Sequence, residues 1–203
     1  LKKVGIVVTA DCDLENKKHA KLVTLVSVVS VKTIMENYLL PEDCEKKRPQ
    51  IESYVFRCFS IENDQEVETK KALLIDEIKK TKISHDDASI VAAKFITDQL
   101  TSLSVKEYKA VMNASGSGVK KTDAINRQIS DRGDLLILPD SEALEINGCV
   151  AWVRQIWQVP LNSIALRTSE TRSRDGEKIA RLDSPFRYRL TQLMAQVFSD
   201  IGL

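Results

Sequence analysis

The sequence predicts an α+β fold, in which a small, β-barrel-like antiparallel sheet carries a large helical insertion and a C-terminal helix. Three observations predict it. Two β-branched runs near the start, residues 4–10 and 21–31, are typical of buried strands. Apolar residues recur at helical spacing within residues 66–103. Ser184-Pro185 is typical of a helix start, and an apolar stripe follows it.

The first run reads Val-Gly-Ile-Val-Val-Thr-Ala at residues 4–10 and contains no alternation of polar residues. We therefore expect a central strand that is buried on both faces. The second run is expected to pair with it. Residues 34–40 then look helical, and we expect this helix to stop at Pro41, because proline lacks the backbone N–H that a continuing helix needs.

These elements divide the chain into three parts. Residues 1–33 and 133–203 are expected to form a β-rich core with the C-terminal helix, and residues 34–114 a helical insertion. Residues 115–132 begin with Ser-Gly-Ser-Gly and continue with polar residues, which predicts a flexible linker between the two.

Two tryptophans lie in the expected strand at residues 149–159. Trp152 and Trp157 are five positions apart, so on a regular strand they point to opposite faces of the sheet. One of them is then expected in the core and the other at an interface. We take Trp157 as the candidate binding residue.

Composition limits the classes of function. Thirty basic and 29 acidic residues give a net charge of +1, which removes any global electrostatic argument for a polyanionic partner. No run approaches the roughly 20 apolar residues that a membrane helix needs. The four cysteines are scattered without a C-x-x-C pair, and two histidines are too few for a multi-histidine metal centre. We expect a cytoplasmic protein with reduced thiols and no membrane contact.

The most chemically suggestive motif is Asp11-Cys12-Asp13, at the end of the first strand. Its two carboxylates are candidate Mg²⁺ ligands if the protein is a nuclease, and Cys12 is a candidate nucleophile if a partner lowers its pKa. The alternative is structural: Cys12 is a small buried residue, and the aspartates cap the turn. Apart from this conditional Mg²⁺, we expect no cofactor.

Two groups of arginines are candidate binding residues. Arg127 and Arg132 lie with Asp131 and Asp134 around a glycine, where they could bind an anionic group or form a structural ion-pair cluster. Arg187 and Arg189 begin the last helix, after the densest positive charge of the chain. They are the best candidates for contact with nucleic acid, although exposed charge often serves only to keep a surface solvated.

Two strand segments resemble the MazF/PemK-like toxin barrels. They are residues 5–13, Gly-Ile-Val-Val-Thr-Ala-Asp-Cys-Asp, leading into residues 21–30, and residues 148–164, which read Gly-Cys-Val-Ala-Trp-Val-Arg-Gln-Ile-Trp-Gln-Val-Pro-Leu-Asn-Ser-Ile. This resemblance implies a barrel and toxin-type endoribonuclease activity. Cys12-Asp13-Leu14, with the stretch from Leu182 to Arg187 and the end of the chain, also resembles accessory proteins of bacterial antiviral defence loci.

The leading hypothesis is a non-catalytic or regulatory interaction component that works with a larger protein partner in a bacterial stress or antiviral defence system. One alternative is a toxin-type endoribonuclease, or another nuclease, that uses residues 11–13 and basic residues such as Arg127 or Arg132. Another is a thiol-dependent enzyme at Cys12. Nucleic acid remains a possible partner through a local basic patch.

Overall fold

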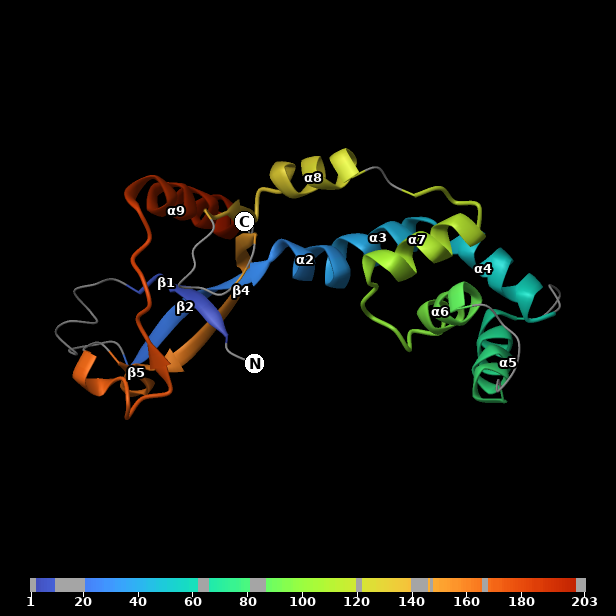
Figure 1. Cartoon of the computed structure of the whole chain (residues 1–203), viewed down its shortest axis with the longest axis horizontal. Coiled ribbons are helices and arrows are strands. Elements are labelled where there is room, and N and C mark those ends of the chain that lie inside the picture. The colour runs from blue at the N-terminus through green and yellow to red at the C-terminus, as the bar shows by residue number, and fades with distance from the viewer. Residues whose placement is uncertain are drawn as a thin grey trace. The chain divides into compact units, whose positions relative to one another are not determined.

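The computed structural model describes residues 3–9, 21–61, 66–80, 87–119, 122–139, 146, 148–165 and 168–199 (Figure 1). The chain divides into two compact units. Leu1–Val31 and Asn126–Leu203 form the first, which we call the sheet unit, and Lys32–Ile125 form the second, the helical unit. The first boundary falls two residues before the one expected from sequence. Asp11, Cys12 and Asp13 lie outside the described residues.

The sheet unit contains a four-stranded antiparallel sheet in the order β1-β2-β4-β3. A separate pair of short parallel strands, β5 and β6, follows it in the chain. The strands are β1 (Val4–Val7), β2 (Leu22–Ser30), β3 (Leu135–Ile137), β4 (Cys149–Pro160), β5 (Ile164–Ala165) and β6 (Gly176–Glu177). The predicted α+β class is confirmed, as is the antiparallel sheet.

The expected closure of this sheet into a barrel is wrong for the part of the chain that the structure describes. β1 and β3 are the two edges of the sheet and do not pair with each other. The expectation that the first strand is central is also wrong: β2 and β4 occupy the centre. An edge strand has a neighbour on one side only, which leaves the side chain of Val7 42% exposed.

The C-terminal helix α9 (Ser184–Ser199) covers one face of the sheet. Leu190, Leu193 and Val197 are spaced at three and four residues, so they share one side of the helix, and all three are buried. They pack in one cluster with strand residues that include Val26 and Val28. The predicted stripe and helix start are both confirmed, since α9 begins at Ser184.

The helical unit is built from consecutive short helices (Figure 1). They are α2 (Val31–Ile34), the π-helix η1 (Met35–Leu39), α3 (Leu40–Lys46), α4 (Arg48–Cys58), α5 (Val67–Lys80), α6 (Asp87–Ile96) and α7 (Val105–Ala114). Helix α7 begins with a capping box, in which Ser104 and Glu107 exchange hydrogen bonds with each other's backbone N–H.

The expected helix stop at Pro41 is wrong, because a π-turn carries the chain past it. Leu40 donates its backbone N–H to the carbonyl of Met35, five residues back, and α3 begins with Pro41 in its first turn. A proline is tolerated there, since the first N–H groups of an α-helix have no intrahelical partner.

Arg48 ties two helices of this unit together. Its guanidinium makes a bidentate pair with Glu45, with two N···O distances of 2.7 Å, and also contacts Asp98 at 3.3 Å. A further N–H donates to the carbonyl of Ile96 at the end of α6. With Glu52 at 3.6 Å, the same group therefore pairs with three carboxylates and also satisfies a helix-terminal carbonyl.

The stretch expected to be a flexible linker is partly helical. Helix α8 (Thr122–Asp131) occupies most of residues 115–132, and its Ile125 and Ile129 are buried. Their spacing of four residues places them on one side of the helix, a short apolar signal within a polar stretch. Gly116 and Gly118 precede it with positive φ angles of 71° and 75°.

Candidate functional site

The pairing of β2 with β4 contains a shift that places both tryptophans on one side of the sheet. Val26 lies opposite Ile156, but the next residue, Ser27, lies opposite Trp152. Three β4 residues, 153–155, therefore have no β2 partner in this register. Side chains alternate between the two faces of a strand. An odd number of extra residues in β4 therefore moves each later β4 side chain to the face opposite the one that regular alternation would give it. The expectation that Trp152 and Trp157 point to opposite faces is wrong.

We call this side of the sheet the tryptophan face. Residues that are directly opposite on antiparallel strands share a face, and the pairs Leu25–Trp157 and Ser27–Trp152 are two positions apart on β2. The face is the one that α9 does not cover. Its residues on β1, β2 and β4 include Gly5, Val7, Leu25, Ser27, Trp152 and Trp157. Both indoles are partly exposed, and Val7 is exposed beside them.

Trp157 packs closely against Gly5. A β-carbon on Gly5 would lie 3.2 Å from Cζ2 of Trp157 and 3.0 Å from Cβ of Leu25, so any larger residue would crowd the indole where it lies across β1. Lys3 places its ammonium group 5.9 Å from the centre of the Trp157 ring, within the range of a cation–π contact. The Trp157 indole therefore contacts both the backbone of β1 and the ammonium group of Lys3.

Trp152 is fixed by a buried carboxylate. Its indole N–H donates to Asp134, whose Oδ2 is 3.3 Å away. Asp134 is only 5% exposed, and it also accepts two hydrogen bonds from Arg132, at 2.9 and 3.0 Å, while Arg154 Nε lies 3.2 Å from it. Burial raises the pKa of the Asp134 carboxyl, but the hydrogen bonds and positive charge of Arg132, with Trp152 and Arg154, outweigh burial and hold the pKa below its ordinary value.

The arrangement is suited to binding. Trp152 and Trp157 lie on the same face of the sheet, and each is in contact with neighbouring residues of the unit. Parts of both rings remain accessible to solvent. A ligand that covers them gains apolar contact area and loses little side-chain freedom in doing so. The cations of Lys3 and Arg154 lie at the border of this surface, and Arg154 is 54% exposed.

The described residues that were predicted from sequence lie on different elements of the sheet unit. Trp157 lies on the tryptophan face, and Arg132 supports that face through Asp134. The contacts of Arg132 therefore fit the structural alternative, an ion-pair cluster. Arg127 is exposed on α8, and Arg187 and Arg189 are exposed on α9. Their roles in binding stay predictions.

Gly5 and Lys3 are residues of this surface that sequence reasoning did not select. A glycine within a β-branched run often marks a close approach to another group, and this signal was available at Gly5. Lys3 gives no comparable signal, because its position over an indole depends on the pairing of three strands.

Two of the three described thiols are poorly suited to nucleophilic chemistry, because they are buried, whereas Cys58 is half-buried. Cys44 and Cys149 are buried. Burial, with the neighbouring carboxylates Asp43 and Glu45, raises the pKa of the Cys44 thiol to about 12.

Among the described residues, no group of three or more histidine, cysteine or acidic side chains is placed to hold a metal ion, and no helix is both long and apolar enough to cross a membrane.

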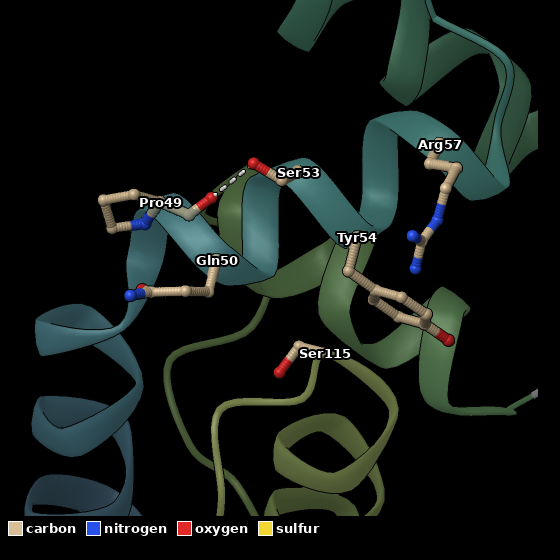
Figure 2. Close-up of a pocket in the computed structure, with 6 residues that line it drawn as sticks. All are labelled: Pro49, Gln50, Ser53, Tyr54, Arg57 and Ser115. Atoms are coloured by element: carbon tan, nitrogen blue, oxygen red, sulfur yellow. Dashed lines mark hydrogen bonds between the residues drawn. The ribbon is translucent and has the colours of Figure 1, made fainter.

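The helical unit contains a shallow pocket of about 350 Å³. Figure 2 shows its lining, which is Pro49, Gln50, Ser53, Tyr54, Arg57 and Ser115. Two of its hydroxyls are used internally: Ser53 donates to the carbonyl of Pro49, and Ser115 to that of Met112. Because the pocket is open and its serines are engaged in this way, the tryptophan face is the stronger candidate site.

Comparison of the chain with protein families, with characterised proteins and with solved structures gave no match.

Proposed function

We propose that this chain is a non-catalytic interaction component that works with a larger protein partner, and that the tryptophan face is its contact surface. The observation that carries the proposal is the shared facing of Trp152 and Trp157, both partly exposed. The resemblance to accessory proteins of defence loci suggests that the partner belongs to a bacterial stress or antiviral defence system.

The physical support comes from how the two indoles are held. Tryptophan is among the residues that contribute most to protein–protein affinity, because a large apolar area and one N–H donor are presented by a side chain with only two torsions. Here one ring packs against Gly5 and the other donates a hydrogen bond to Asp134. Little conformational entropy remains to be lost when a partner covers them.

The test is the affinity of the variant Trp157→Ala for the products of neighbouring genes, each purified and titrated by calorimetry. We expect one of these proteins to bind the unmodified chain, and the variant to bind it about 30-fold more weakly, the effect of losing a central aromatic contact. Circular dichroism checks that the variant is folded.

The matched control is Phe198→Ala. Phe198 is also a large aromatic residue and is 45% exposed, but it lies on α9 and not on the tryptophan face. It should leave the affinity unchanged. The proposal is contradicted if neither substitution changes the affinity, if both weaken it equally, or if no neighbouring gene product binds.

A further inference from the structure

Positive charge is concentrated at the start of α9 and in the segment that leads into it. Residues 177–190 contain four basic residues and two acidic ones, Glu177 and Asp183, although the whole chain has a net charge of only +1. The four basic residues are all exposed, and we call them the cationic segment. They are Lys178, Arg181, Arg187 and Arg189. A field of this kind attracts a polyanion locally, whatever the charge of the rest of the molecule.

An exposed aromatic ring lies between the two arginines of the helix. Leu190, Leu193 and Val197 define the buried side of α9. At 100° per residue, Tyr188 points almost directly away from that side, with Arg187 and Arg189 to either side of it. Tyr188 is 72% exposed, so its ring is available for stacking.

One of the two arginines is placed where the helix itself disfavours it. Arg187 lies at the end of the first turn of α9, near the positive end of the helix dipole, and the first turn contains no acidic residue, whereas Arg189 lies in the second turn. Ion pairs between either arginine and another residue are absent from the part of the molecule that the structure describes. A bound anion would offset this unfavourable interaction.

From this combination we infer that the cationic segment, with Tyr188, binds single-stranded nucleic acid. The guanidinium groups of Arg187 and Arg189, on the two flanks of Tyr188, would each contact a phosphate, and the ring of Tyr188 would stack on an unpaired base, the combination by which single strands are held without sequence preference. The site goes beyond the proposed function. It lies on the helix that covers the sheet face opposite the tryptophan face, so a protein partner and a nucleic acid would not compete for one surface.

The test is fluorescence polarisation of labelled single-stranded RNA and DNA oligonucleotides and of the corresponding duplexes, at several salt concentrations from about 50 mM upwards. We expect the full chain to bind single strands more tightly than duplexes. Arg187→Ala/Arg189→Ala should reduce the slope of log K against log salt by about 1.4, because each lost phosphate contact on a single strand removes about 0.7. Tyr188→Ala should weaken binding at least about fivefold and Tyr188→Phe should not, because phenylalanine keeps the stacking surface.

The matched control is Lys106→Ala/Lys109→Ala, which removes the same charge from exposed positions of α7 in the helical unit. It should leave the slope unchanged. The inference is overturned by equal losses in the two double variants, by insensitivity to Tyr188→Ala, or by absence of binding at the lowest salt. Displacement by poly-glutamate as effective as by unlabelled oligonucleotide would also overturn it, and would assign the surface to an acidic protein. None of these outcomes depends on Trp157, so this inference and the proposed protein interaction fail or succeed separately.

Discussion

Replacing Gly5 by alanine is expected to destabilise the sheet unit by about 2 kcal/mol and to move Trp157 from its position over β1. The new methyl group would lie 3.0 Å from Cβ of Leu25, which is attached to the backbone of the central strand and cannot easily move, and 3.2 Å from the Trp157 ring. The ring must therefore shift. The measurement is urea unfolding followed by tryptophan fluorescence, which reports on the sheet unit because both tryptophans of the chain, Trp152 and Trp157, are in it.

Gly133→Ala is the control for this substitution. A β-carbon at Gly133 would have Gln196 Nε2 as its nearest neighbour, at 3.8 Å, which is an ordinary contact. We expect its effect to stay within about 0.5 kcal/mol. In a Trp157→Ala background the cost of Gly5→Ala should fall but not vanish, since the contact with Leu25 remains. Equal costs at the two glycines would contradict the described position of Trp157.

Asp134→Asn is expected to lower the free energy of unfolding of the same unit by about 2 kcal/mol at neutral pH. The amide cannot accept a bidentate pair from Arg132, and one of its two polar atoms becomes a donor facing other donors. The loss is kept moderate because the side chains of Arg132 and Arg154 are 30% and 54% exposed and can be hydrated.

The same carboxylate predicts a dependence of stability on pH. The pKa of Asp134 is lowered in the folded state, so its contribution is complete above the ordinary aspartate pKa of about 4 and is lost as the pH falls through the folded-state pKa. The unmodified chain should therefore lose more stability on acidification below pH 4 than Asp134→Asn does. Asp131→Asn, which changes an exposed carboxylate on α8, serves as the control and should follow the unmodified chain. Parallel curves for all three proteins would contradict the ion-pair cluster.

The sequence predicted those parts of the fold that depend on local periodicity. The β-branched runs did form paired strands, and the apolar stripe after Ser184 did form the closing helix. The errors arose where a partner decides the outcome. Whether the first strand is central or at an edge depends on which strands pair. Whether the helix ends at Pro41 depends on a π-turn, which the helix propensities of single residues do not reveal.

The candidate site shows the same division. Trp157 could be selected because tryptophan is enriched at protein interfaces. Its relation to Trp152 could not be predicted, because the facing of both depends on three β4 residues that have no partner on β2, and nothing in the local sequence separates these from the residues that have one. Asp134 was recognised within a charged cluster, whereas its contact with Trp152 required the pairing of β3 with β4.

The most direct test of the account is the register of β2 against β4, because the tryptophan face exists only if that register shifts. Nuclear Overhauser effects between these strands can be measured in the isotopically labelled chain. We predict contacts of Leu25 with Trp157 and of Ser27 with Trp152. Contacts of Ser27 with Gln155, the residue that an unshifted register would place opposite it, would put the two tryptophans on opposite faces and contradict the account.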